Sequence, residues 1–308
     1  MNQLGIAPPG FRLPDATHIE SVRLQIADLT RSVAYYTTVL GMHVLSQSEG
    51  NADLGVESDD RALLKLVEKR GARAVPRRGL LGLYHFAILL PDRPSLGRFV
   101  AHLRDIGAYA GMSDHLVSEA VYLTDPDGLG IEVYADRPES TWRLVDQQLE
   151  MATKPMDVAS VIASGEGREW DGMPSGTKIG HVHFHVGDID EAARFYHGGL
   201  GMDKIVWSYP GALFMSAGGY HHHVGVNTWA AGAPPASGDD ARLLDWEVVV
   251  PDSGAVQGAA ASIATAGFEV DRDGDAMVAR DPWGIQLRLR TETAGITRRA
   301  VRGTGGLS

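Results

Sequence analysis

The period of the apolar residues changes at intervals along the chain, and these changes predict its strands and helices. The stretch Leu83–Leu90 is a continuous apolar run that Pro91 ends, which is typical of a buried strand. Between residues 29 and 40 the apolar residues recur with helical spacing, with Asp28 as a suitable N-cap and Gly41 as a suitable residue to follow the helix. The pattern therefore predicts a chain that mixes short strands with separate helices.

The same pattern occurs twice. The segments Ile26–Met42 and Val186–Met202 both contain an Asp, a helical apolar pattern and a closing Leu-Gly-Met. The segments Leu83–Asp92 and Leu243–Asp252 are separated by the same offset as the first pair. Repeats of this kind indicate that one structural unit is used more than once. We therefore expect residues 1–137 and 179–290 to form two domains that follow one plan.

Each copy divides again into halves that begin with a strand. The four predicted βαβββ modules cover residues 19–68, 83–137, 180–229 and 243–290, and the helix of the second is expected at Leu96–Ile106. Residues 138–178 are expected to form a polar linker with a helix around Trp142–Met151. The tail, residues 291–308, is expected to be weakly ordered.

Four such modules, together with several motifs, resemble the vicinal oxygen chelate superfamily, which includes glyoxalases and extradiol dioxygenases. The motifs are YHFAILLPD, SDHLVSEAVYLTDPDGLGIEVYADRP, IGHVHFHVGD and GGYHHHVGVNTW. They are most similar to those of ring-cleaving dioxygenases of the catechol 2,3-dioxygenase type. The resemblance implies an α+β fold in which pairs of modules form two cups of curved sheet. It also implies a metal in a cup, with ligands from the first and last strands of a module.

The resemblance points to one set of metal ligands. The first-strand positions of the four modules hold Ser21, His85, His181 and Asp245, and the clearest last-strand positions hold Glu132 and Arg288. Among these residues only His85, Glu132 and His181 form a plausible ligand set. The chain has no cysteine, so a metal must be bound by histidine and carboxylate groups. Two imidazoles and one carboxylate are typical of non-haem Fe(II) oxygenases, and Mn(II) suits the same ligands.

This ligand set has a consequence for the topology. If neighbouring modules paired, His85 and Glu132 would lie in one cup and His181 in the other. If modules two and three pair, and one pairs with four, all three residues meet in one cup. We therefore expect the metal cup to consist of modules two and three. The alternative is sequential pairing, with the His and Glu residues as remnants of a site.

The resemblance also implies groups for acid–base chemistry beside the metal. His223 matches the family's base position, and its neighbour His222 is a rival assignment. Tyr122 lies before Glu132 as the catalytic tyrosine of the family lies before its carboxylate ligand. His115 matches the acid–base histidine, although its spacing from Tyr122 is shorter than in typical members. An imidazole suits this role because it changes protonation near neutral pH.

Composition narrows the range of partners. The formal net charge of −11 argues against nucleic acid or an anionic membrane as a partner. No apolar stretch approaches the roughly 20 residues of a membrane span, and the first residues lack the pattern of a signal peptide. Together with the absence of cysteine, this leads us to expect a cytoplasmic protein. The sheet edges are compatible with a homo-oligomer.

The sequence thus predicts an Fe(II)-dependent extradiol dioxygenase that acts on an aromatic diol, of catechol or hydroquinone type, with O₂. Two alternatives remain on the same fold. One is a glyoxalase-like isomerase or transferase, whose sites usually have an extra carboxylate or Gln ligand. The other is a non-catalytic protein that binds a small molecule.

Overall fold

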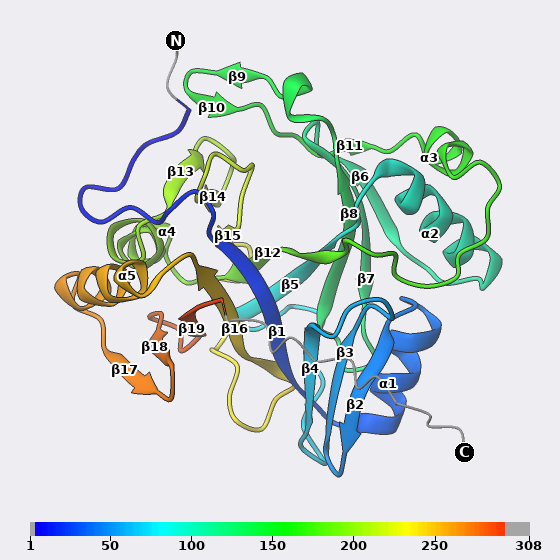
Figure 1. Ribbon diagram of the computed structural model, residues 1–308, viewed down its shortest axis with the longest axis horizontal. Coiled ribbons are helices and arrows are strands. Elements are labelled where there is room, and N and C mark those ends of the chain that lie inside the picture. Colours follow the sequence, from blue (N-terminus) through cyan, green and yellow to red (C-terminus); the bar gives the residue numbers. More distant parts are fainter. Residues whose placement is uncertain (1–3, 293–308) are drawn as a thin grey trace, which may run out of the picture.

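The computed structural model describes residues 4–292 and contains the four predicted modules. Residues 293–308 of the predicted tail lie outside the described residues. Figure 1 shows two strongly curved sheets with helices on their outer sides. In each module the first strand pairs in parallel with the last, and the remaining strands follow in antiparallel order.

The elements of each module have the following bounds. Module one has β1 (His18–Ile26), α1 (Leu29–Thr38), β2 (His43–Ser48), β3 (Asn51–Gly55) and β4 (Ala62–Glu68). Module two has β5 (Gly82–Leu89), α2 (Arg93–Asp105), β6 (Gly111–Asp114), β7 (Ser118–Thr124) and β8 (Gly130–Asp136). Module three has β12 (Lys178–His185), α4 (Ile189–Ala193) with a π-helical continuation (Arg194–Gly199), β13 (Asp203–Val206), β14 (Ala212–Ser216) and β15 (Val224–Asn227). Module four has β16 (Arg242–Val250), α5 (Ser253–Thr265), β17 (Val270–Asp273), β18 (Ala276–Arg280) and β19 (Gln286–Thr291).

The helices begin where the sequence places a capping aspartate. The side chain of Asp28 accepts a hydrogen bond from the backbone N–H of Arg31 at the start of α1, as predicted. Helix α2 begins three residues earlier than the apolar pattern indicated, at Arg93. The reason is that Asp92 caps it by accepting from the N–H of Ser95.

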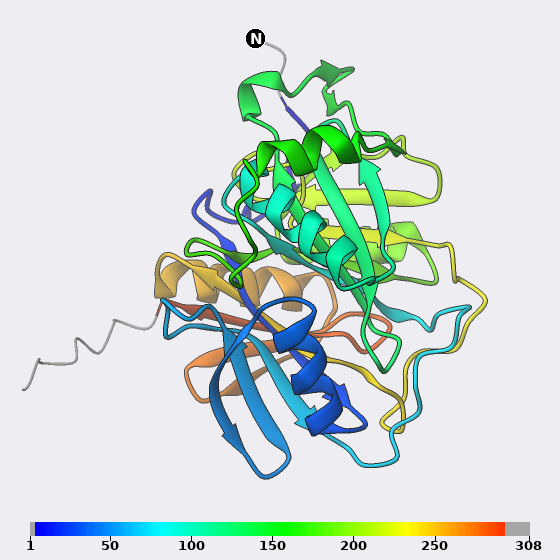
Figure 2. The ribbon, with the colours of Figure 1, turned by 90° about the vertical axis from the view of Figure 1, so that its right-hand side faces the viewer.

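The modules pair as the ligand set required. The first sheet has the order β11-β6-β7-β8-β5-β12-β15-β14-β13, so modules two and three join through the antiparallel pair β5–β12. The second sheet has the order β17-β18-β19-β16-β1-β4-β3-β2, so modules four and one join through β1–β16. Figure 2 shows the two sheets one above the other, with modules two and three in the upper one. The prediction of a cup made from modules two and three is therefore confirmed.

The segment between the halves differs from its prediction. No helix forms around Trp142–Met151. The chain there makes a short 3₁₀ turn (Glu139–Thr141) and a small hairpin of β9 (Leu144–Val145) and β10 (Gln148–Leu149). Asp146 and Gln147, at the tip of the hairpin, have positive φ angles, which a continuous helix does not contain. Strand β11 (Lys154–Pro155) then extends the first sheet, and the only α-helix of the segment is α3 (Val158–Ser164).

The core lies between the convex sides of the two sheets. Along β12, Val182 and Phe184 are buried in this core, whereas the alternate residues turn into the cup of modules two and three. The ring of Phe184 packs against that of Trp246 on β16, with 5.9 Å between the centroids. Strand β12 therefore supplies the core from one face and the cup from the other. No helix in the described part of the chain is both long and apolar enough to cross a membrane.

Candidate active site

Three side chains meet where modules two and three join. His85 on β5, Glu132 on β8 and His181 on β12 are all buried. The Nε2 atoms of His85 and His181 are 3.3 Å apart, and Oε2 of Glu132 lies 3.0 Å from the first and 3.2 Å from the second. Bonds of about 2.1 Å to one metal place neighbouring octahedral ligand atoms roughly 3 Å apart. The three atoms thus have the spacing of one face of a coordination shell.

The register of three strands produces this arrangement. His85 is paired with His183 across the antiparallel strands, so His181 lies diagonally opposite it on the same face. Glu132 lies on β8, the parallel neighbour of β5, and pairs there with Ala87, which places its carboxylate beside the strand that carries His85. Two ligands therefore come from adjacent strands of one module, and the third requires the exchange of modules.

The electrostatics of the three groups suit a bound cation. Burial opposes the ionisation of Glu132, but the adjoining imidazoles of His181 and His85 outweigh it and hold the pKa of the carboxyl well below its ordinary value. Burial lowers the pKa of His181 to about 4, against the opposing effect of Glu132. An ionised carboxylate and neutral imidazoles are the protonation states that metal ligands need.

The three ligand atoms also fit a bound divalent cation. Three buried ligand atoms converge on one point, and such a cluster of polar groups is costly unless something compensates it. A divalent cation bound there would do so. Within residues 4–292, this trio is the only group of three or more His, Asp or Glu side chains close enough to share a metal ion. The chemistry of two imidazoles and a carboxylate, with the cavity side open, fits a non-haem iron or manganese ion.

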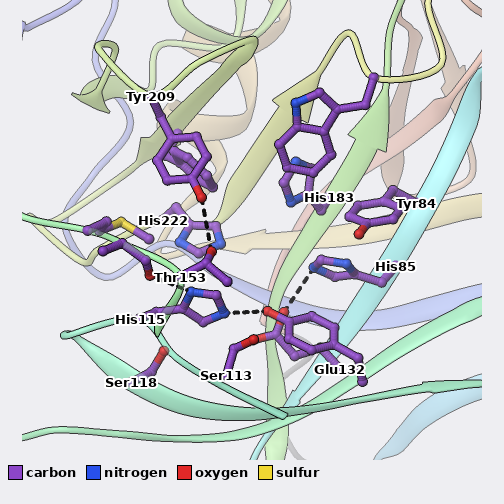
Figure 3. A pocket seen from close by; sticks show the side chains of 15 residues that line it. Tyr84, His85, Ser113, His115, Ser118, Glu132, Thr153, His183, Tyr209 and His222 are labelled. Carbon is purple, nitrogen blue, oxygen red and sulfur yellow. Dashed lines mark hydrogen bonds and ion pairs between the residues drawn. The ribbon is translucent and has the colours of Figure 1, made fainter. Parts of the chain in front are cut away.

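A cavity of ≈ 300 Å³ opens beside the trio, with His85 and Glu132 in its wall (Figure 3). Its walls combine aromatic rings with a few polar groups, which is the usual composition of a site for a small molecule. They are formed by Tyr84, His85, Ser113, His115, Ser118, Tyr122, Glu132, Met151, Ala152, Thr153, His183, Tyr209, Phe214, His222 and Trp229.

Tyr122 and His115 face each other on one side of this cavity. The Tyr122 hydroxyl and Nε2 of His115 are 2.6 Å apart, and Nδ1 of His115 lies 2.8 Å from the carbonyl of Ala152. A carbonyl only accepts, so Nδ1 of His115 donates, and Nε2 of the neutral ring accepts from Tyr122. Burial and the nearby Glu132 raise the pKa of Tyr122 well above its ordinary value, so its hydroxyl keeps the proton.

The structure separates the two rival histidines of module three. His222 lines the cavity and packs on His181, with 4.0 Å between the ring centroids. His223 is not part of the cavity wall, because its Nδ1 accepts from the backbone N–H of Ala217. Of the two rival assignments, the structure thus places His222 in the cavity wall and His223 outside it. The physical reason is local: strand β15 begins only at Val224, so the three histidines lie in the bend before it and do not follow regular strand alternation.

Behind His222 lies a chain of hydrogen bonds that the sequence did not reveal. Nδ1 of His222 is 2.7 Å from Nδ1 of His221, and Nε2 of His221 is 2.9 Å from Oδ1 of Asp136. The hydroxyl of Tyr220 donates to Oδ2 of Asp136 at 3.0 Å. The one signal of this arrangement in the sequence is the run of three consecutive histidines inside an apolar context.

Sequence reasoning also missed two parts of the wall. One is Tyr84, which a register shift in the β5–β12 pair turns into the cup beside His85. The other is the linker, whose residues Met151, Ala152 and Thr153 cover the cavity. The hydroxyl of Thr153 hydrogen-bonds that of Tyr209 at 2.9 Å, which ties the linker to module three (Figure 3). A polar segment without periodicity gave no indication of this role.

In the second cup, which modules one and four form, acidic side chains are paired with arginines. Asp245 takes the position that corresponds to a ligand, but its carboxylate is paired with Arg23. Arg290 similarly pairs with Glu247 at 2.7 Å. Among the described residues, these carboxylates therefore do not form a second group that could share a metal ion.

The chain belongs to the Glyoxalase/Bleomycin resistance protein/Dioxygenase superfamily. The sequence pattern of this family matches residues 18–133 and 178–289. Within it, the chain is 43% identical over 270 residues to the catechol-2,3-dioxygenase of Bacillus subtilis (strain 168), covering 86% of this chain and 94% of that protein. This similarity supports a dioxygenase activity that depends on a metal.

Solved structures show the same fold at low identity. A candidate dioxygenase from Bacillus subtilis subsp. subtilis strain 168 aligns with a TM-score of 0.63 and 15% identity, over 92% of this chain and 87% of that one. A mutant of glyoxalase I from Zea mays aligns with a TM-score of 0.54 and 18% identity, over 90% and 92% of the two chains. Both the dioxygenase and the glyoxalase branches of the superfamily thus use this architecture.

Proposed function

We propose that this protein is an Fe(II)-dependent extradiol dioxygenase, which uses O₂ to open the ring of a catechol-type or hydroquinone-type diol. One observation carries the proposal. The His85–Glu132–His181 trio opens onto a cavity whose walls hold Tyr122 hydrogen-bonded to His115 on one side and His222 on another. Ring cleavage needs both a metal and groups that move protons, and this cavity brings the two together.

The metal would supply open coordination sites for the two diol oxygens and for O₂, and the protein side chains would supply the proton transfers. His222 is placed to accept a proton from a diol hydroxyl, because its ring lines the cavity and lies against His181 of the trio. Tyr122 donates its single hydroxyl proton to His115 here, so its oxygen is placed to accept from a diol hydroxyl, and it can donate to a bound oxygen only when Nε2 of His115 itself carries a proton. His115, which accepts from Tyr122, is placed to exchange a proton on that side.

The aromatic rings in the cavity wall favour a small aromatic substrate. The rings of Tyr84, Phe214 and Trp229 contribute apolar walls, and the ring of His183 lies 5.6 Å from Phe214 and 5.9 Å from Trp229, measured between centroids. An aromatic substrate ring gains both apolar burial and edge contacts from such neighbours.

The composition of the wall argues against the glyoxalase-like alternative. Glu132 is the only carboxylate among the residues that line the cavity, and no Gln lines it. The cavity therefore lacks the extra carboxylate or Gln ligand that the sequence comparison associates with glyoxalase-like sites. The His115–Tyr122 pair likewise argues against a protein that only binds its ligand.

The proposal is tested with protein that is purified without oxygen and loaded with Fe(II). We expect O₂ uptake with at least one member of a panel of catechols, biphenyl diols and hydroquinones, and none from the Glu132→Ala variant. A variant such as Asp245→Ala, in the second cup, is the matched control for loss of a buried carboxylate. If the iron-loaded protein consumes no O₂ with any diol, the proposal is wrong.

A further inference from the structure

We propose that Asp136 and His221 are positioning residues, which hold His222 in the tautomer that carries its proton on Nδ1. Nε2 of His222, the nitrogen left for a ligand in the cavity, is then a proton acceptor. This inference rests on the proposed function, in which His222 accepts a proton from the substrate. The observation behind it is the chain of hydrogen bonds from His222 through His221 to Asp136.

The direction of each hydrogen bond follows from the carboxylate. A carboxylate oxygen accepts, so the 2.9 Å contact has His221 donating from Nε2 to Asp136. In the tautomer of His221 with its proton on Nε2, Nδ1 carries the lone pair, and the 2.7 Å contact between the two Nδ1 atoms requires His222 to donate. Among the described residues, no group hydrogen-bonds Nε2 of His222. The lone pair on that atom is therefore available to a ligand in the cavity.

Packing and further hydrogen bonds hold the side chains of His221 and Asp136 in place. The His221 side chain is fully buried, and its ring lies against Tyr220 and Trp142 with centroid distances of 4.1 and 5.5 Å. Both oxygens of Asp136 have donors, because Oδ2 accepts from Tyr220, whose oxygen lies 2.6 Å from that of Tyr134. A carboxylate fixed at both oxygens cannot rotate away from His221 without losing a second hydrogen bond.

The chain also explains why this region requires both modules. Asp136 is the last residue of β8 in module two, whereas His221 and His222 precede β15 in module three. The Asp136 side chain is 26% exposed, so the chain runs from the cavity to the protein surface. The same exchange of modules that assembles the metal ligands therefore also orients the base.

A histidine ring without such a partner can adopt either neutral tautomer, and the tautomer with the proton on Nε2 would donate to the substrate instead of accepting from it. In serine proteases, replacing the carboxylate that orients the catalytic histidine costs about 10⁴ in kcat because the ring takes the wrong tautomer. The chain of hydrogen bonds in this protein would orient His222 in the same way, with His221 between the carboxylate and the base.

The test uses the tautomer of His222 itself. Long-range ¹H–¹⁵N spectra of the uniformly labelled, metal-free protein distinguish the two neutral tautomers, and His222→Gln identifies the signal. We expect the Nδ1–H form in the wild type and loss of that form in Asp136→Asn. Asp245→Asn, which alters a paired carboxylate of the second cup, is the matched control and should leave the signal unchanged.

Turnover gives the second readout. In iron-loaded protein, Asp136→Asn should lower kcat about 100-fold, the scale of one acid–base group, while KM for the diol and the iron content change little. His221→Phe keeps the shape of the ring but removes both hydrogen bonds, and it should behave in the same way if Asp136→Asn folds poorly.

The outcomes are distinguishable. A wild-type His222 that carries its proton on Nε2, or an Asp136→Asn variant with unchanged tautomer and kcat, would overturn the positioning role. If the wild type turns over no diol while Asp136→Asn still changes the tautomer, the proposed function fails and the positioning role stands.

Discussion

Nε2 of His85 lies 3.3 Å from Nε2 of His181, across the strand pair that joins modules two and three. The two residues are far apart in the sequence and come from different copies of the repeat. Their contact exists because the modules pair by exchange, and Glu132 completes the trio.

The first prediction concerns metal binding. His85→Ala and His181→Ala should each reduce bound iron to a small fraction of one equivalent, because a two-ligand site holds iron far less tightly than a three-ligand site. Metal analysis after anaerobic loading and desalting measures this. His183→Ala removes a histidine of the same cup that is not in the trio, and it should retain iron. Full iron content in either ligand variant would contradict the assigned site.

A second prediction separates the neighbouring histidines. His222→Gln should lower kcat about 100-fold, because the cavity loses its proton acceptor on that side. His223→Gln should retain kcat and lose about 1–3 kcal/mol of unfolding free energy, because the buried hydrogen bond from Ala217 is disturbed. Steady-state kinetics and urea unfolding measure the two effects. The reverse pattern would restore His223 as the base.

The third prediction concerns the hydroxyl of Tyr122. Tyr122→Phe keeps the ring but removes the donor to His115, and kcat should fall about 10- to 100-fold with iron content unchanged. Tyr36→Phe is a matched control, because the Tyr36 hydroxyl also has a buried partner, Asp125, but lies outside the cavity wall. It should lose stability without loss of kcat. Equal kcat in Tyr122→Phe and the wild type would remove Tyr122 from the mechanism.

A fourth prediction follows from Asp281, which begins the turn between β18 and β19. Burial raises the pKa of its carboxyl to about 6, although Trp283, Ile285 and Tyr196 donate hydrogen bonds to it. The folded state therefore binds more protons than the unfolded state between the ordinary pKa of about 4 and a pH of about 6. Stability from this group is present at low pH and is lost as the pH rises through that window.

Asp281→Asn removes this titration, and its amide oxygen can still accept from the two backbone groups. The unfolding free energy of the variant minus that of the wild type should grow by roughly 3 kcal/mol between pH 4 and pH 7, which corresponds to a shift of about two pKa units. Denaturant unfolding at several pH values measures the difference. Parallel curves for the two proteins would show that Asp281 does not titrate with a raised pKa.

The sequence was sufficient for those features that depend on periodicity and on motif chemistry. The four modules followed from strand and helix patterns, and the pairing of modules two and three followed from the requirement that His85 and His181 share one site. Capping residues such as Asp28 marked the helices because their side chains bond to nearby backbone, which is a local effect.

Features that depend on irregular backbone could not be predicted from the sequence. Tyr84 enters the cup through a bulge, and His222 does so through a bend, and neither follows from strand alternation. The linker forms a hairpin, followed by residues 151–153 over the cavity, instead of the predicted helix, because tertiary contacts such as that between Ala152 and His115 override a weak local preference. The role of Asp136 required knowledge of which strand ends meet.

The central claim is that the iron centre of modules two and three inserts both atoms of O₂ into a diol ring. Its most direct test is mass spectrometry of the product that the iron-loaded protein forms under ¹⁸O₂ from a diol of the panel that it turns over. We predict one ring-opened aldehyde acid that contains both labelled atoms before exchange with water, cleaved beside the diol and not between its two hydroxyl carbons. A product with one labelled atom, cleavage between the hydroxyl carbons, or no turnover of any diol of the panel in the presence of a full complement of iron would contradict the claim.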